Sequence, residues 1–301
     1  MLYINGDIYV GQFSKDCFSG IGEFTGGENN NEIKSFFGNW ENNKKHGYGT
    51  LEYKNGDHYR GNFEDDLYGD YGCITYKVPE KSTKKESEVV TKYDGYHLNG
   101  LPHGKGIKFF KDGSTYEGYL QNGLYHGEGT LKYPEKGQGT LLKFEGFFYE
   151  GHKTGKGSVD LKNGDNYNGE WRNGKFHGFG TYLYSEKNPV KTQFQGYFRR
   201  GFEDGAGTEY YKEGYHIKAK WTEGKIVGLA EMIWDKPHPT EIKYYGKIYK
   251  GLKHGKGKQY YTSGDIFDGD WLFGKQEGQG TIYFDKKHPW LVKSEGCYKN
   301  G

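Results

Sequence analysis

Aromatic residues and glycines alternate along this chain in a pattern that recurs from one end to the other. The basic motif is aromatic-x-Gly-x-aromatic, as in residues 59–63 with the sequence YRGNF. Because successive side chains of a β-strand point to opposite faces, the two rings and the glycine share one face, and Arg60 and Asn62 share the other. The pattern therefore predicts short strands with one aromatic face and one polar face.

The motifs are grouped in pairs of unequal repeats. Most successive repeats begin 23 or 27 residues apart, and two steps are longer, at 34 and 28 residues. The unit is therefore a pair of repeats that spans about 50 residues. The repeats start at Tyr9, Phe36, Tyr59, Tyr93, Tyr116, Phe144, Tyr167, Phe194, Ile217, Tyr244, Phe267 and Ser294.

Glycines hold fixed positions in each repeat. The position seven residues after each start holds Gly, Asn or Asp, which tolerate a positive φ best, so we expect a tight turn there. Asn-Gly-Asp sequences at residues 5–7, 55–57 and 163–165 are strong signals for two-residue hairpin turns. Each repeat is thus predicted to be a pair of antiparallel strands. In the repeat that starts at Ile217, Ala219 and Ala230 replace two glycines, so its ring stacking should differ.

Composition indicates what such a chain can bury. Its 301 residues include 51 Gly, 29 Tyr, 19 Phe and 6 Trp, and its mean hydropathy is only −1.00. We therefore expect a core of aromatic rings stacked on glycine backbone instead of the aliphatic core of a typical enzyme. The predicted fold class is all-β: an elongated single-layer antiparallel β-ribbon of about 11 hairpin repeats, with residues 1–301 forming one array.

Charge and cysteine content narrow the functional classes. The 42 basic and 40 acidic residues nearly balance, which argues against nucleic-acid binding, because that affinity comes mainly from Lys and Arg on phosphates. No apolar stretch approaches the roughly 20 residues of a membrane span, and the first residues lack the pattern of a secretory signal. Cys17, Cys73 and Cys297 are odd in number and far apart, as expected in a reducing, cytoplasmic compartment.

Candidate chemical sites are few. Residues 151–158 resemble a phosphate-binding loop but lack the Ser or Thr that should follow Lys156. Consecutive repeats should lie about 10 Å apart, too far for side chains in equivalent positions to share a metal ion. We therefore expect no metal, no cofactor and no enzymatic activity. The spacing argument applies to five histidines in the tenth position after a repeat start: His46, His103, His126, His177 and His254.

Every second connection between repeats is lengthened, and in the predicted sheet all of these long connections lie on one edge. They contain six of the seven prolines, and in the longest one Glu residues are interspersed among the Lys residues. We therefore expect protein partners along this edge, and membrane lipid contact less than protein contact. Rigid apolar groups lose little entropy on docking, so the candidate interaction residues are Pro189, Pro237, Pro239, Pro289 and Trp290.

The best-preserved repeat, residues 167–180 with the sequence YNGEWRNGKFHGFG, resembles the MORN signature Y-x-G-x-W-x-x-G-x-x-H-G-x-G. The resemblance extends over essentially the whole chain. It implies a curved single-layer β-ribbon and relatives such as radial-spoke head proteins of cilia, cytoskeletal scaffolds of protists and junctophilins, which link membranes. Other members carry a kinase or methyltransferase domain, for which the repeats leave no segment here.

Two functional hypotheses follow. The first is a non-catalytic structural scaffold or spacer that mediates protein–protein interactions in a cytoskeletal assembly, for which we expect a ciliary or flagellar axoneme and a radial-spoke-like role. The alternative is a peripheral lipid-binding module that tethers membranes to the cytoskeleton. The open strand ends of the array should also pair with a partner or with a second copy, since unpaired strand edges readily accept another chain.

Overall fold

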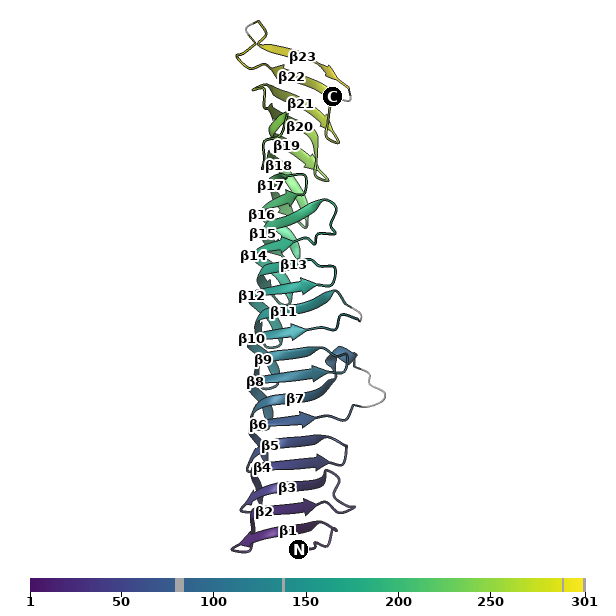
Figure 1. Ribbon diagram of the computed structural model, residues 1–301, viewed down its shortest axis with the longest axis vertical. Coiled ribbons are helices and arrows are strands. Elements are labelled where there is room, and N and C mark those ends of the chain that lie inside the picture. The colour runs from purple at the N-terminus through teal and green to yellow at the C-terminus, as the bar shows by residue number, and fades with distance from the viewer. Residues whose placement is uncertain (79–83, 137–138, 289, 300–301) are drawn as a thin grey trace. The chain divides into compact units, whose positions relative to one another are not determined.

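The computed structural model describes residues 1–78, 84–136, 139–288 and 290–299 (Figure 1). These residues form β-strands connected by turns, and the short 3₁₀ helix Glu86–Glu88 is the exception. The predicted all-β class, an open antiparallel sheet, is confirmed. Internal contacts divide the chain into two units, Met1–Gly155 and Lys156–Gly301, and each is described by itself.

In the first unit, each strand pairs antiparallel with the next one along the chain, from β1 through β11. Figure 1 shows these strands following one another in chain order, so the unit is an open sheet. Its strands are β1 (Ile8–Ser14), β2 (Cys17–Thr25), β3 (Ile33–Glu41), β4 (Lys44–Tyr53), β5 (His58–Glu64), β6 (Leu67–Thr75), β7 (Val90–Leu98), β8 (Leu101–Phe110), β9 (Thr115–Gln121), β10 (Leu124–Lys132) and β11 (Leu141–Tyr149).

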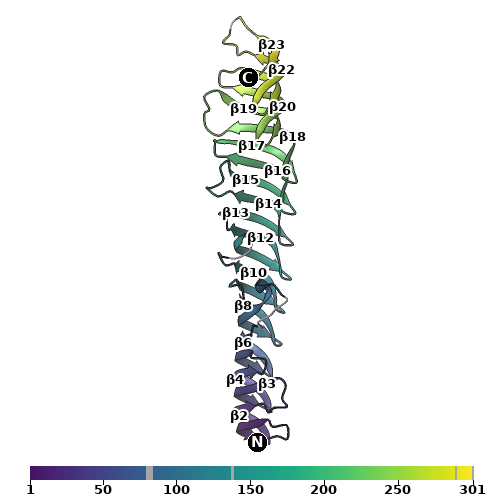
Figure 2. The same ribbon diagram turned by 90° about the vertical axis from the view of Figure 1, so that its right-hand side faces the viewer.

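The second unit repeats the arrangement, with consecutive antiparallel pairing from β13 through β23 (Figure 2). Strand β12 (His152–Leu161) contains the boundary between the units. The other strands are β13 (Asn166–Arg172), β14 (Lys175–Leu183), β15 (Lys191–Arg199), β16 (Phe202–Tyr211), β17 (Tyr215–Thr222), β18 (Lys225–Trp234), β19 (Glu241–Tyr249), β20 (Leu252–Tyr261), β21 (Ile266–Leu272), β22 (Lys275–Tyr283) and β23 (Lys293–Tyr298).

The predicted tight turn within each repeat is confirmed. Asp16, Asn43 and Asp66 have φ angles of 63°, 66° and 71°, and Gly174 in a later repeat has 74°. Two of these polar side chains also accept hydrogen bonds from backbone N–H groups. The Asn43 side chain accepts a hydrogen bond from the Phe18 backbone N–H at 2.7 Å, and Asp66 accepts one from the Lys45 backbone N–H at 3.0 Å. Turns of neighbouring repeats are thereby tied together.

The core consists of rings lying on glycine backbone, as the sequence predicted. Tyr167 is 0% exposed and lies against Gly169 and Gly180, which face each other across β13 and β14. A Cβ atom added to Gly180 would lie 2.5 Å from the Tyr167 hydroxyl oxygen. The hydroxyl itself donates to the Glu170 carbonyl at 2.9 Å. The glycines are therefore required by the close approach of the ring.

A second layer covers these rings in alternation, a feature that the sequence analysis missed. In the repeats that start at Tyr9, Tyr59, Tyr116 and Tyr167, a second ring stacks on the first with centroids 3.7 to 3.9 Å apart. In the repeats that start at Phe36, Phe144 and Tyr244, the same position holds a lysine: Lys45, Lys153 or Lys253. The Lys153 Nζ lies 4.7 Å from the centroid of the Phe144 ring, in the range of a cation–π contact.

The repeat that starts at Ile217 packs differently, as expected. Ile217 is fully buried and belongs to a cluster with Ala230, Met232 and Tyr244. Ala219 packs against the same cluster. Because isoleucine is shorter than tyrosine, the alanine Cβ atoms occupy space that a ring fills in the other repeats.

Candidate interaction surfaces

An aspartate after the hairpin turn fixes the start of each of four long connections. The Asp165 carboxylate accepts hydrogen bonds from the Ser185 backbone N–H, the Asn163 side-chain amide and the Tyr182 hydroxyl, each at 2.7 Å. The bond to a backbone N–H twenty residues later recurs with the same geometry. We call this feature the aspartate clamp; it joins Asp7 to Gly27, Asp57 to Lys77, Asp165 to Ser185 and Asp265 to Asp285.

Hydrogen bonding in the aspartate clamp also lowers the pKa of two of its carboxylates. The Gly27 backbone N–H holds the pKa of Asp7 below its ordinary value, and the Asp285 backbone N–H lowers the pKa of Asp265. A hydrogen bond to a carboxylate stabilises the ionised form, which is the physical cause of both shifts. The Asp7 and Asp265 carboxylates therefore stay charged at neutral pH.

A polar side chain caps the far end of several long connections. Asn188 Oδ1 accepts from the Val190 and Lys191 backbone N–H groups at 2.9 and 2.8 Å, and His238 Nδ1 accepts from the Glu241 backbone N–H at 3.1 Å. Pro189 and Pro239 directly follow these capping residues. In the connection between β14 and β15, the Asp165 clamp and the Asn188 cap thus fix the backbone at both ends.

The structure places the predicted interaction residues in three different connections of the second unit. Pro189 lies between β14 and β15, Pro237 and Pro239 between β18 and β19, and Trp290 between β22 and β23; all four are exposed. Pro289 lies outside the described residues. Because the strands pair consecutively, these connections lie on the same edge of the sheet, about 19 Å apart along it. Trp290 is 94% exposed, so it does not cover the ring core.

Trp234 supports the connection that holds Pro237 and Pro239, and sequence reasoning did not identify it. The His238 ring stacks on the Trp234 ring with centroids 4.1 Å apart. The Trp234 Nε1 donates to Glu241 at 3.3 Å, and Lys253 donates to the same carboxylate at 2.7 Å. Burial lowers the pKa of Lys253, and Glu241 opposes that shift. A Trp that directly precedes a proline-containing connection was the available signal.

The face of the sheet opposite the ring core, here called the outer face, carries half-exposed rings. In the first unit the Tyr71 and Tyr96 rings meet edge to face at 5.3 Å, and the Tyr71 hydroxyl donates to Asp94 at 2.8 Å. Lys105 Nζ lies 5.2 Å from the centroid of the Tyr119 ring. These rings were assigned no role from the sequence, because half-exposed aromatic residues are common on protein surfaces.

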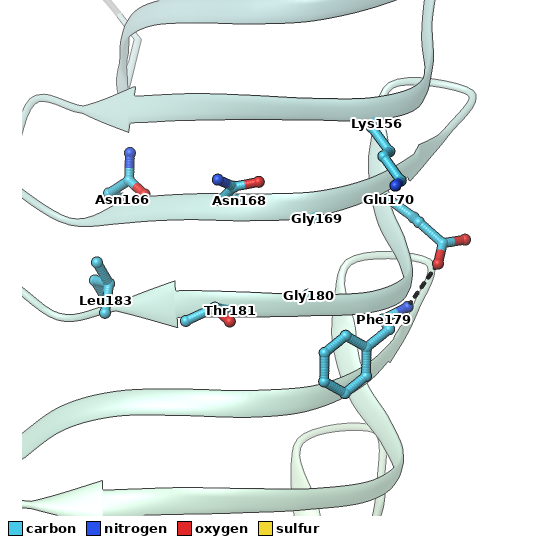
Figure 3. Close-up of a pocket in the computed structure, with 9 residues that line it drawn as sticks. All are labelled: Lys156, Asn166, Asn168, Gly169, Glu170, Phe179, Gly180, Thr181 and Leu183. Atoms are coloured by element: carbon cyan, nitrogen blue, oxygen red, sulfur yellow. Dashed lines mark hydrogen bonds between the residues drawn. The ribbon is translucent and has the colours of Figure 1, made fainter.

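In the second unit the outer face has a shallow hollow of about 670 Å³ over β13 and β14 (Figure 3). Its lining combines polar side chains with Phe179 and Leu183, and Glu170 accepts a hydrogen bond from the Phe179 backbone N–H at 3.3 Å. Small-molecule sites are usually more enclosed. The hollow therefore resembles a contact surface more than a substrate pocket. Its side chains include Lys156, Asn166, Asn168, Glu170, Phe179, Thr181 and Leu183.

One buried histidine was not identified from the sequence. His97 is 6% exposed and contacts Tyr59, Tyr68 and Tyr93 edge to face at centroid distances of 5.6, 5.5 and 5.0 Å. Burial lowers its pKa to about 4. The same position in the other repeats holds mainly Phe or Trp, which was the available signal.

The predicted histidine column lies at the strand ends near the tight turns. His46 Nε2, for example, lies 3.4 Å from Glu41 Oε2. Among the described residues, no group of three or more His, Cys, Asp or Glu side chains is placed to hold a metal ion. In the same part of the chain, no helix has the length and apolar character needed to cross a membrane.

Comparison with known proteins agrees with the repeat geometry. The MORN repeat family model matches residues 36–58, 93–115, 116–138, 167–188, 194–214, 244–266 and 267–287. Alsin from Rattus norvegicus and alsin from Homo sapiens are each 26% identical over 160 residues, a match that covers 51% of this chain and 9% of alsin. The chain therefore aligns with only a small part of these relatives.

Among solved structures, the TCP10 domain of Danio rerio CPAP in complex with a peptide of Danio rerio STIL aligns over 84% of this chain and 95% of that chain. The TM-score is 0.36 and the sequence identity is 11%. The family matches cover more than half of the chain, and each matched segment contains the ring and glycine pattern described above. The chain belongs to the MORN-repeat family.

Proposed function

We propose that this protein is a non-catalytic scaffold that binds partner proteins along its long-connection edge. The supporting observation is that hydrogen bonds hold the backbone of these connections, through His238 beside Pro237 and Pro239 and through the Asp265 clamp before Trp290, while Pro237, Pro239 and Trp290 remain exposed. A preorganised apolar group loses little entropy on binding, which favours affinity. Loops that served only to cover the core would bury these groups.

Several lysines at the long connections already bind groups of the protein itself, which favours a protein partner over a lipid surface. Lys54 Nζ donates to the Gly27 carbonyl at 2.6 Å, and Lys212 Nζ donates to the Glu186 carbonyl at 2.6 Å. Lys111 lies 3.4 Å from Glu86. These lysines therefore act within the fold. Binding to an anionic membrane gains about 1 kcal/mol for each basic residue near the surface, which makes the lipid-tethering module the second candidate function.

The finer proposal is a position in a cytoskeletal assembly, specifically a ciliary axoneme. It rests on the resemblance to radial-spoke head proteins. Fluorescence microscopy of a tagged full-length chain in the source cells tests it: axonemal signal would support the assignment, and signal confined to membranes would favour the lipid alternative.

A pair of exposed aromatic residues on opposite edges tests the scaffold function. Trp290→Ala should reduce recovery of partner proteins by the full-length chain several-fold, because a central aromatic anchor often dominates binding. Phe273→Ala, in the tight turn between β21 and β22, is the matched control and should leave recovery unchanged. Both variants should melt at the wild-type temperature. Co-sedimentation with anionic liposomes, together with equal partner recovery for both variants, would contradict the proposal.

A further inference from the structure

The outer face of the first unit carries a motif shared by three successive repeats. Residues 93–96, 116–119 and 144–147 read YDGY, YEGY and FEGF, so each has an acid and an aromatic residue on either side of the glycine. None of the other nine repeat starts has this combination. We call the six side chains the outer ladder: Asp94, Tyr96, Glu117, Tyr119, Glu145 and Phe147.

Strand register aligns the ladder. Gly95 pairs with Gly106, Gly106 with Gly118, Gly118 with Gly129, and Gly129 with Gly146. The three acids therefore form one column and the three rings a parallel column on the same face. Members of a column lie two strands apart, which is about 9.6 Å at the usual strand spacing.

The ladder rings are about half exposed. Each lies beside a left-handed glycine of its own repeat. A Cβ atom on Gly104, Gly127 or Gly155 would lie 3.4, 3.5 or 3.6 Å from the Cβ of Tyr96, Tyr119 or Phe147. Those glycines have φ angles of 68°, 60° and 61°. The ladder is therefore a row of half-exposed rings beside a row of carboxylates.

The distance between successive members of a ladder column matches the repeat of one extended peptide conformation. A polyproline II helix advances about 3.1 Å per residue, so every third residue recurs after about 9.3 Å on the same side. This distance nearly equals the step of the ladder. Proline-rich segments in this conformation dock on aromatic rows. The acidic column calls for lysine or arginine in the ligand, since opposite charges attract.

We propose that the outer ladder binds a proline-rich, basic segment of a partner protein in the polyproline II conformation, running across β7, β9 and β11. Prolines contact the rings, and lysine or arginine side chains reach the carboxylates. Lys92 and Lys143 already lie 3.3 and 2.6 Å from Asp94 and Glu145, so the ligand's cations share these carboxylates. The inference deepens the scaffold function and rests on it.

The second unit supplies a matched control position. Tyr197 occupies the slot of the ladder rings and lies over Gly205 in the same way. Its repeat has Gln195 where the ladder has an acid, and the adjacent repeats have Glu170 and Lys220 in place of rings. The exposed Tyr197 ring meets the Phe179 ring edge to face at 5.6 Å, but it has no ladder column of rings and acids.

Fluorescence anisotropy with the full-length chain tests the proposal. The probes are fluorescein-labelled peptides made of four copies of Pro-Pro-Arg, Gly-Ser-Arg or Pro-Pro-Glu. The Pro-Pro-Arg peptide should bind, and its affinity should fall with salt. Tyr119→Ala and Glu117→Lys should each weaken binding by at least about fivefold, as expected for a central contact, whereas Tyr197→Ala should not.

Three results would overturn the ladder: equal binding of the Gly-Ser-Arg peptide, equal loss in Tyr197→Ala, or no binding of the Pro-Pro-Arg peptide up to about millimolar concentration. Thermal melts followed by circular dichroism verify that the variants are folded. Glu117→Lys changes an exposed side chain, so it remains informative where Tyr119→Ala reduces stability. Failure here together with the expected loss in Trp290→Ala would reject the ladder and leave the scaffold function standing.

Discussion

At the scale of single residues, the ring core requires glycine at one position of a repeat and accepts alanine at the equivalent position of another. Gly180 must lack a side chain because the Tyr167 ring lies against it, with only 2.5 Å between the hydroxyl oxygen and an added Cβ. Ala230 holds the equivalent position under Ile217 and is 2% exposed. The size of the first core side chain and the size of the residue beneath it are therefore matched in these two repeats.

This matching predicts that Gly180→Ala and Ala230→Gly differ in their cost in folding stability. Gly180→Ala should destabilise the protein by about 2 to 3 kcal/mol, because the core must shift to accept the methyl group. Ala230→Gly should cost only about 1 kcal/mol, from lost packing and greater freedom of the unfolded chain. Urea denaturation followed by circular dichroism measures both. Equal midpoints for the two variants would show that the ring does not constrain the glycine.

His97 makes the first unit sensitive to acid. Its pKa is about 4 in the folded protein and about 6.5 in an unfolded chain, so protons bind the unfolded state more tightly. Stability is therefore complete above about pH 6.5 and falls as the pH drops towards 4, by up to about 3 kcal/mol. His97→Phe should remove this part of the pH dependence of unfolding.

The control for this pH profile is His58→Phe, which changes an exposed histidine on β5. Its profile should follow that of the wild type. A parallel loss of stability in acid for wild type and His97→Phe would assign the effect to other groups.

At the scale of elements, the aspartate clamp determines how a long connection leaves the sheet. Asp165→Ala removes the acceptor of three hydrogen bonds in a side chain that is 8% exposed. It should cost about 2 kcal/mol or more, because the Ser185 N–H loses its partner. Asp57→Ala, in a more exposed clamp, should cost less. Hydrogen exchange at residues 185–191 should accelerate in Asp165→Ala, and unchanged exchange there would exclude an anchoring role.

The hairpins, the tight turns and the assignment of faces could be predicted because each depends on residues close together in the sequence. The alternation of rings and glycines is visible within five residues. Gly, Asn or Asp at one position of the repeat indicates a residue with a positive φ. The clamp could not be predicted in this way, nor could the positions of Lys153 over the Phe144 ring and of Lys253, whose Nζ lies 5.0 Å from the centroid of the Trp271 ring. They depend on contacts between residues far apart along the chain, such as Asp165 with Ser185 and Lys253 with Glu241.

The candidate site was predicted only in part. Proline and tryptophan identify exposed rigid groups without knowledge of the fold, so Pro189, Pro237, Pro239 and Trp290 were found as exposed residues. The outer ladder was missed, because its rings look like ordinary surface residues until the register places Tyr96, Tyr119 and Phe147 in one column.

At the scale of the whole molecule, consecutive pairing implies that stability is local. In a repeat array each unit contacts chiefly its neighbours, so damage should not spread far. Phe267→Ala should increase hydrogen exchange in β20 to β23 and leave β3 to β6 at wild-type rates. Mass spectrometry of exchanged peptides measures both regions in one experiment. A uniform increase along the chain would indicate a single cooperative unit instead.

The aspartate clamp also constrains how proteins of this design can change in length. Each clamp joins an aspartate to a backbone N–H twenty residues later, and clamped aspartates lie one pair of repeats apart at Asp7 and Asp57 and two pairs apart at Asp165 and Asp265. Loss of one repeat would place the aspartate before a short connection, whereas loss or duplication of a pair preserves every partner. Related genes should therefore differ by insertions and deletions of about fifty codons, with recombination points in equivalent turns.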